Sequence, residues 1–227
     1  MGEQKVTIVK DGPYMVSGVV PLNERIMVSN GHHREYKPGR TFPLADKYAL
    51  CRCGHSSNPP FCDGTHVHEH FDGTEVASTK PFDERAQVFE GSTLDLYDDN
   101  RCAFARFCHR EDGEVWTLTE ESGDPALRAE AIQAAVDCPA GRLVQHDKQN
   151  GYQEIEPTLK PEISILQDPE RSVSGPLFVQ GAIPLVSAQG FTYELHNRYA
   201  LCRCGSSCNK PFCDAMHVSI GFQDDLE

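Results

Sequence analysis

The sequence has few basic residues and no long apolar run. It contains 21 lysines and arginines against 34 aspartates and glutamates, which gives a formal net charge of −13 at pH 7. Such a surface repels the phosphates of nucleic acids and of anionic lipids, so we expect no nucleic-acid partner and no membrane partner. No apolar run approaches the roughly 20 residues that a membrane-spanning helix needs.

Signals that would send the chain elsewhere are also missing. The first residues, MGEQKVTIVKDG, lack the apolar core of a secretory signal peptide and the Ser or Thr of a myristoylation signal. We therefore expect a cytoplasmic protein. The sequence contains no Gly-rich nucleotide-binding loop and no nucleophile constellation, so an enzyme is not the favoured class, and any catalysis would belong to a partner.

What the sequence does contain is ten cysteines. In a reducing compartment, clustered cysteines bind metal or carry redox chemistry more often than they form disulfides. A disulfide framework would be the alternative reading in a secreted protein. Cys51 and Cys53 argue against it, because one residue separates them and each would need a different distant partner.

An internal repeat occupies the two ends of the chain. Residues 48–67 and 199–218, YALCRCGHSSNPPFCDGTHV and YALCRCGSSCNKPFCDAMHV, are identical at fifteen of twenty positions without a gap. Upstream, 12–22 and 175–185 share Gly, Pro, Val, Gly, Pro and Leu at matching positions. The second copy reaches its cysteines twelve residues sooner, so the first contains an insertion around NGHHREYKPGR. Such a repeat indicates two similar structural units.

Each copy is expected to place short strands around a cysteine loop. The segments YMVSGVV and LFVQGAI are short, β-branched and interrupted by glycine, as is typical of twisted strands with a bend. A short helix is expected after the third cysteine of each copy, with Asp63 and Asp214 as N-caps.

The segment between the copies has a different pattern. TLDLYDDN alternates like a strand, and residues 125–138 predict an Ala-rich amphipathic helix that begins at a proline. We expect one face of this helix to contain Leu127, Ile132, Ala135 and Val136. The proline-containing segments 78–85 and 147–172 are expected to be linkers.

The cysteine loop of the first copy offers three thiolates and one imidazole, from Cys51, Cys53, Cys62 and His66. A Cys₃His zinc site and an iron–sulfur cluster are both possible. Zinc sites usually use a C-x₂₋₄-C spacing. A one-residue spacer instead places two thiolates on adjacent strand-like positions, which suits one iron of a two-iron cluster while Cys62 and His66 serve the other. The residues alone favour iron–sulfur and leave zinc open.

Residues 51–66 match every position of the pattern C-x-C-x₂-S/T-x₃-P-x-C-D-G-S/A/T-H. The segment thereby resembles the CDGSH iron–sulfur family. The resemblance implies a 2Fe–2S cluster in each copy, with the C-x-C pair on one iron. The second copy keeps all four ligands, which are Cys202, Cys204, Cys213 and His217.

The second copy departs from the family pattern at two positions. Ala215 replaces a glycine and disfavours a positive φ, and Met216 places bulk beside the cluster, where we expect it to shield His217 from water. The additional Cys208 is expected to be a loop thiol without a ligand role. A neutral histidine ligand raises the reduction potential relative to a thiolate and can exchange a proton. The remaining histidines without partners at metal spacing are expected to be solvated: His32, His33, His68, His70 and His196.

The middle segment, about residues 86–146, contains Cys102, Cys108 and a Cys138-Pro pair. It resembles a small single-cluster bacterial ferredoxin of the 3Fe–4S kind, in which the central cysteine of the usual run is missing, and Ala105 occupies that place here. It also resembles a divergent 4Fe–4S domain with three cysteines. A non-cysteine fourth ligand, with His109 nearby, and three buried cysteines without a cluster are the other readings.

The expected fold is α+β and β-rich. Two CDGSH-type units, 1–80 and 173–227, are expected to form an intramolecular pseudo-dimer because family members often pair as homodimers. A small ferredoxin-like α+β domain at 86–146 and a linker at 147–172 would connect them.

The expected function is electron transfer through two Cys₃His 2Fe–2S clusters and one three-cysteine cluster, with 3Fe–4S favoured over 4Fe–4S. A cluster donor or redox sensor is the alternative, and a structural zinc protein is the less favoured one. Because the chain is acidic, we expect a redox partner protein with a basic docking face. We expect a monomer, with a homodimer as the alternative.

Overall fold

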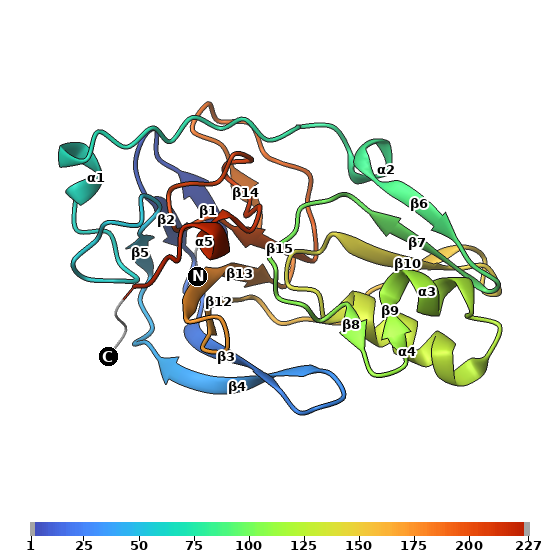
Figure 1. Ribbon diagram of the computed structural model, residues 1–227. Helices are drawn as coiled ribbons and strands as arrows, with labels where there is room; N and C mark the ends of the chain where they lie inside the picture. Colours follow the sequence, from blue (N-terminus) through green and yellow to red (C-terminus); the bar gives the residue numbers. More distant parts are fainter. Residues whose placement is uncertain (1–2, 225–227) are drawn as a thin grey trace.

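A computed structural model describes residues 3–224 of the chain. The described residues form three main sheets, a two-stranded ribbon and short helices (Figure 1). This architecture is α+β and rich in β-structure, as the sequence predicts. None of the helices in this part of the chain has the length and apolarity to cross a membrane.

Sheet A has the strand order β14-β1-β2-β5 and contains strands from both copies of the repeat. Its strands are β1 (Lys5–Ile8), β2 (Tyr14–Ser17), β5 (Lys47–Leu50) and β14 (Leu185–Val186). The first three belong to the first copy, whereas β14 belongs to the second copy and pairs in parallel with β1.

Sheet B has the order β15-β13-β12-β3-β4 and is the counterpart of sheet A. Its strands are β3 (Leu22–Ser29), β4 (Arg34–Thr41), β12 (Glu162–Asp168), β13 (Val173–Gln180) and β15 (Arg198–Leu201). Here β3 comes from the first copy and pairs in parallel with β12 of the second. The insertion NGHHREYKPGR forms the turn of the β3–β4 hairpin and most of β4.

The exchange of strands follows the same register in both sheets. Leu185 lies opposite Val6, and Leu22 lies opposite Ile163. The amide of Val6 donates to Pro184 O at 2.9 Å, and the amide of Ile163 donates to Pro21 O at 2.9 Å. The two sheets also share one core, to which Val6 and Ile163 both contribute fully buried side chains. Burial of each such side chain stabilises the fold by about 1.5–3 kcal/mol. Because residues of both copies form this one core, each copy needs the other to bury its apolar side chains.

Sheet C, with the order β11-β10-β7-β6, belongs to the segment between the copies. Its strands are β6 (Gln87–Glu90), β7 (Leu94–Asp98), β10 (Leu143–Asp147) and β11 (Gln153–Ile155), and the ribbon consists of β8 (His109–Arg110) and β9 (Gly113–Glu114). The helices are α1 (Thr65–His68), α2 (Phe82–Arg85), α3 (Val115–Glu120), α4 (Pro125–Val136) and α5 (Met216–Ser219). In Figure 1 this middle segment, green to yellow, forms the right-hand side, and α1 lies at the opposite end.

The prediction that residues 147–172 form a linker is wrong. This segment contains β11 and the buried strand β12, which lies between β13 and β3 in sheet B. The prolines at 157, 161 and 169 flank β12 and do not interrupt it, because none of them lies within the strand. The expected linker at 78–85 likewise contains α2.

Helix α4 begins at Pro125, as predicted, after the N-cap Asp124, whose carboxylate accepts from the amide of Ala126 at 2.7 Å. The predicted face is confirmed only in part, because Ala135 is buried and Leu127 and Ile132 pack against the core. The buried residues are Ala131, Ala134 and Ala135, and Ile132 only packs at the edge of the core. Small side chains allow the helix to pack closely against sheet C and α3, so the alanines define the buried face.

Candidate metal centres

The cysteine loop of each copy leaves the last strand of its unit and is closed by backbone hydrogen bonds. In the first copy, the amide of Cys51 donates to Pro60 O at 2.8 Å and that of Cys62 donates to Ala49 O at 2.9 Å. The second copy repeats both bonds, from Cys202 to Pro211 O and from Cys213 to Ala200 O, at 2.9 Å each. The strand therefore fixes the first and third cysteines of each loop next to each other.

Within each loop the four predicted ligands lie in two pairs. The sulfurs of Cys51 and Cys53 are 3.7 Å apart, and Cys62 Sγ is 3.4 Å from His66 Nδ1. In the second loop the corresponding distances are 3.7 Å for Cys202 to Cys204 and 3.5 Å for Cys213 to His217.

These distances fit the edges of a metal-centred tetrahedron. Metal–sulfur bonds of about 2.3 Å and metal–nitrogen bonds of about 2.0–2.1 Å separate two thiolates by about 3.8 Å, and a thiolate and an imidazole by about 3.5 Å. Among residues 3–224, no three Cys, His, Asp or Glu side chains are grouped as ligands of a single ion. Two pairs, each on its own metal, fit a two-iron cluster better than a mononuclear zinc site.

A hydrogen bond from the neighbouring cysteine, supported by backbone amides, favours the thiolate of the first cysteine of each loop. Hydrogen bonds from Cys53 and then from the amides of Ser56 and Gly54 lower the pKa of Cys51 to about 5, against the opposing effect of burial. In the second loop the same arrangement, with Cys204 first, lowers the pKa of Cys202 to about 7. A ligand thiol must lose its proton to bind metal, and the same hydrogen bond that favours the thiolate of the first cysteine raises the pKa of Cys53 and of Cys204. All ten cysteines, which lie within the described part, are free thiols.

Asp63 and Asp214 accept hydrogen bonds from backbone amides within their loops. The prediction that they are the N-caps of the short helices is wrong. The caps are Gly64 and Ala215, both left-handed, with φ of 92° and 71°. Asp63 instead accepts from the amide of Thr65 at 3.0 Å and from that of Ser57 at 2.8 Å. Ala215 thus adopts the conformation that glycine has in the first copy, at a cost of about 1–2 kcal/mol for an L-residue.

Cys208 occupies the position of Ser57 in the second loop. Its amide donates to Asp214 at 2.7 Å and the residue is exposed. It pairs with no ligand cysteine of its loop, in agreement with its prediction as a loop thiol.

The two predicted histidine ligands differ in exposure. His66 and Cys62 are both partly exposed, whereas His217 and Cys213 are each only 3% exposed. Burial, and then the charge of Arg203, lower the pKa of His217 to about 4. The burial of His217 agrees with the sequence prediction that this histidine is shielded from water.

The sequence analysis missed two arginines, Arg52 and Arg203, each between the cysteines of a C-x-C pair. Arg52 is 2% exposed and lies 5.5 Å from the ring centre of Phe71, and Arg203 is 3% exposed and lies 5.4 Å from that of Phe222. The repeat carries the signal, because the arginine and the phenylalanine recur at matching positions in both copies.

Residues of each copy contact the loop of the other. Arg203 lines the small cavity beside Cys51 and forms an ion pair with Asp224. Conversely, the buried Tyr14 hydroxyl of the first copy donates to Cys202 O at 2.8 Å. The two loops are thus parts of one packed unit.

The middle segment brings its three predicted ligands together. Cys102, Cys108 and Cys138 line one cavity, and Ala105 lines it with them. Burial and then the charges of Cys138 and Cys102 raise the pKa of Cys108 to about 12. A bound cation would offset the mutual repulsion of thiolates gathered around one cavity, so the donor set fits an iron cluster.

The loop between Cys102 and Cys108 contains residues with left-handed backbone conformations. Phe104 and Arg106 have φ of 54° and 61°, in the left-handed region that such residues rarely occupy. The amide of Phe104 donates to Cys102 Sγ at 3.3 Å. Left-handed residues turn successive amides toward one point, which is an arrangement found around anionic iron–sulfur clusters. His109 does not line the cavity, and its exposed ring lies 3.1 Å from Glu114.

Arg198, at the start of β15, joins the second copy to the middle site. This buried side chain donates to Cys138 O at 2.9 Å, to Ala135 O at 3.0 Å and to Leu143 O at 3.1 Å, and it forms an ion pair with Glu156. It therefore holds the end of α4 and the cysteine that follows. The first copy has the exposed Lys47 at this position.

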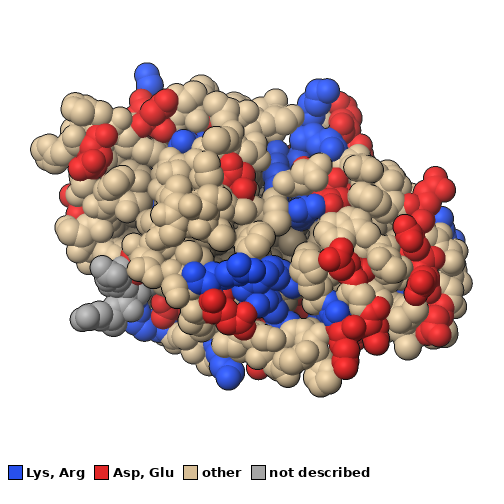
Figure 2. Space-filling view, viewed as in Figure 1, with Lys and Arg blue, Asp and Glu red and all other residues tan. Residues whose placement is uncertain are grey.

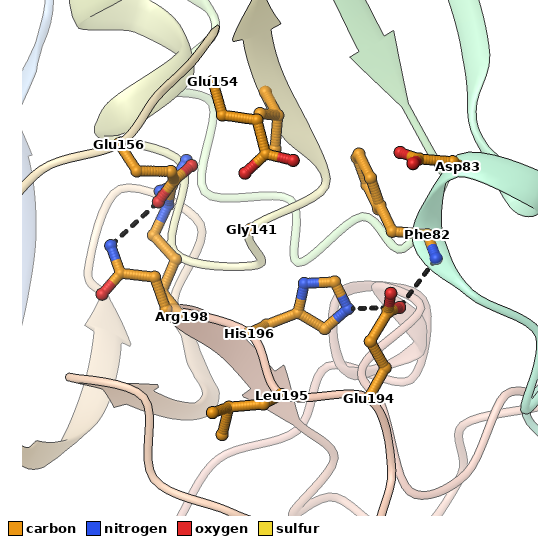
Figure 3. A pocket seen from close by; sticks show the side chains of 11 residues that line it. Phe82, Asp83, Gly141, Glu154, Glu156, Glu194, Leu195, His196 and Arg198 are labelled. Atoms are coloured by element: carbon orange, nitrogen blue, oxygen red, sulfur yellow. Dashed lines mark hydrogen bonds and ion pairs between the residues drawn. The ribbon is translucent and has the colours of Figure 1, made fainter.

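The prediction that His196 is solvated is wrong. Its ring is largely buried, and Nε2 lies 3.0 Å from Glu194 Oε2, at the edge of a polar pocket between the second copy and the middle segment (Figure 3). Burial lowers the pKa of His196. The acidic side chains of Glu154 and Asp83 also line this pocket. Of the other histidines predicted to be solvated, His32, His68 and His70 are exposed, and His33 is partly buried.

The paired ligands and the three-cysteine cavity are those of an iron–sulfur protein. Residues 11–67 and 174–218 match the family described as iron-binding zinc finger, CDGSH type, and residues 89–148 match the family described as divergent 4Fe-4S mono-cluster. The chain is therefore a tandem CDGSH-type protein with a divergent 4Fe–4S segment between its two copies. Comparisons with curated proteins and with solved structures gave no significant match.

Proposed function

We propose that this protein transfers electrons between redox partner proteins. Cys51, Cys53, Cys62 and His66 would hold one 2Fe–2S cluster, and the corresponding residues of the second copy would hold another. The observation that carries the proposal is the division of each ligand set into two pairs at tetrahedral-edge distances. Such clusters supply reversible one-electron reduction.

For the middle site we propose a 3Fe–4S cluster held by Cys102, Cys108 and Cys138. The side chain at the position of the missing cysteine, Ala105, lines the same cavity as the three thiols and offers no ligand atom. A 4Fe–4S cluster with a ligand from outside the protein is the alternative.

We also propose that the repeated units form an intramolecular pseudo-dimer around a ferredoxin-like domain. The matching strand orders of sheets A and B support this, because each sheet is completed by a parallel strand of the other copy. The free state of all ten thiols supports a reducing compartment, and we propose the cytoplasm.

The acidic surface supports a redox partner with a basic docking face. Figure 2 shows acidic side chains gathered on the right, over the middle segment. The exposed acidic residues of this region include Glu90, Glu111, Asp112, Glu114, Glu120, Glu121 and Asp124. Complementary charge accelerates protein association at low salt, so reduction by such a partner would slow as the ionic strength rises.

A cluster donor or redox sensor is the second candidate, and the exposure of His66 favours it for the first site. Protonation of an accessible histidine ligand would weaken its hold on the metal. Repeated anaerobic cycles of chemical reduction and reoxidation distinguish the two functions. Electron transfer predicts that the visible spectrum recovers with the iron retained, whereas a donor would release iron to an apo-acceptor protein within the first cycles.

A further inference from the structure

The second CDGSH-type site lies directly against the middle site. Ala103, Ala140 and Ala200 form one buried cluster with Cys213, and Cys138 packs against the same cluster. Cys213 is a ligand residue of the second copy, and Cys138 is one of the middle site. The layer between the two ligand sets therefore consists of alanine side chains, which allow a close approach.

The first site has no such neighbour. Its third cysteine, Cys62, and its histidine, His66, are partly exposed, and α1 lies at the end of the molecule opposite the middle segment (Figure 1). Ala49, which corresponds to Ala200, is only half-buried, whereas Ala200 is 3% exposed. The middle segment covers one copy of the repeat and leaves the other open.

The backbone fixes this asymmetry. Gly141, two residues after the Cys138-Pro pair, lies so close to the carbonyl of Arg198 that a methyl group there would clash. Arg198 in turn donates to the carbonyl of Cys138. Strand β15, which leads into Cys202, is thus held against the loop that carries Cys138.

We propose that the second CDGSH-type site and the middle site form one coupled redox pair, and that the first site connects to this pair through the second site alone. Each exchange moves one electron, so one site is oxidised as the other is reduced, and no bond forms. The first electron comes from a redox partner protein that contacts the exposed first site, and this partner is different from the one that docks at the acidic face over the middle segment. This inference rests on the proposed function, since it assumes that the three ligand sets hold clusters.

Magnetic interaction between paramagnetic centres tests the pair without a partner protein, because it weakens steeply with distance. We would prepare the full chain as Cys62→Ala, which keeps the second and middle centres, and as Cys213→Ala, which keeps the first and middle centres. Iron analysis verifies that each variant holds two centres. Electron paramagnetic resonance is then recorded at the potential at which both remaining centres are paramagnetic.

We expect split or fast-relaxing signals in Cys62→Ala and two independent signals in Cys213→Ala. Equal coupling in the two variants, or stronger coupling in Cys213→Ala, would overturn the proposal. An iron count of zero in the wild type would instead remove the proposed function itself, so the two failures are distinguishable.

A second pair of variants keeps all ligands, in case a cysteine variant loses its neighbouring centre. Ala200→Leu thickens the layer between the second and middle sites, and Ala49→Leu makes the same change in the first copy. We expect weaker coupling in Ala200→Leu and wild-type coupling in Ala49→Leu. An unchanged signal in Ala200→Leu with full iron content would count against the alanine layer as the contact.

Discussion

Gly54 of the first cysteine loop lies against the backbone of Cys204 in the second. A methyl group on Gly54 would lie 2.7 Å from Cys204 O, and Gly205 meets Cys53 O in the corresponding way. Both glycines have positive φ, of 83° and 78°. Only glycine combines this conformation with so close a backbone approach, so the two metal-binding loops depend on each other for their shape.

The contact between Gly54 and the Cys204 backbone predicts that a single substitution at Gly54 reduces metal binding at both CDGSH-type sites. Gly54→Ala should lower the iron content of both CDGSH-type sites, because the methyl group must push the Cys204 backbone away. Gly64→Ala is the control, since Gly64 also has a positive φ but no atom within 4 Å of the added methyl group. Iron analysis and visible absorption measure the outcome. Loss of a single site in Gly54→Ala would contradict the interdependence.

The left-handed cap of each loop gives a matched pair of stability predictions. Ala215→Gly should raise the free energy of unfolding by about 0.5–1 kcal/mol, because glycine removes a left-handed cost of about 1–2 kcal/mol and adds back about 0.5–1 kcal/mol of chain entropy. Gly64→Ala should lower it by a similar amount. Anaerobic urea unfolding measures both, and a stabilised Gly64→Ala variant would show that the φ angles are misassigned.

The position of Ala105 predicts a cluster conversion. Ala105→Cys would add a fourth thiolate to the cavity of Cys102, Cys108 and Cys138, so a 4Fe–4S cluster should form in place of 3Fe–4S. The resonance signal of the oxidised middle centre should disappear, with about one more iron per chain. An unchanged spectrum, together with a Cys102→Ser variant that retains all its iron, would mean that the three cysteines hold no cluster.

Acid should release iron from the first CDGSH-type site before the second. Burial lowers the pKa of His217 from 6.5 to about 4, so its neutral form is fully favoured above pH 6.5, and the stability that it contributes is lost as the pH falls toward 4. The corresponding residue of the first copy, His66, is partly exposed to solvent. Visible absorption followed during acidification should therefore fall in two phases.

Single variants assign these phases. His66→Cys should remove the earlier one, because a protonatable imidazole is replaced by a thiolate, and His217→Cys should affect only the later one. If His217→Cys removes the earlier phase, exposure does not set the order of release.

The candidate ligands of the two repeat loops could be picked out from the sequence because their spacing is local. The spacing of Cys51, Cys53, Cys62 and His66 follows from one loop on one strand, and the repeat supplies a second example of it. The start of α4 could also be predicted, because Pro125 marks the first residue of the helix. Local patterns with a physical cause were sufficient in these places.

Contacts between distant segments could not be predicted in the same way. Nothing in the sequence of β3 or β14 indicates that each pairs with a strand of the other copy. The prolines that flank β12 favour a linker in the sequence, although the short segment ISIL within it suits a buried strand. The contacts of Arg198 depend on where the middle segment packs, which is a tertiary property.

Metal analysis of anaerobically purified protein tests the central claim most directly. Two 2Fe–2S clusters and one 3Fe–4S cluster predict about seven irons and about eight acid-labile sulfides per chain, with visible absorption and a resonance signal from the oxidised middle centre. Eight irons would replace the 3Fe–4S assignment by 4Fe–4S and leave the two CDGSH-type sites intact. A colourless protein with stoichiometric zinc and no labile sulfide would contradict the account.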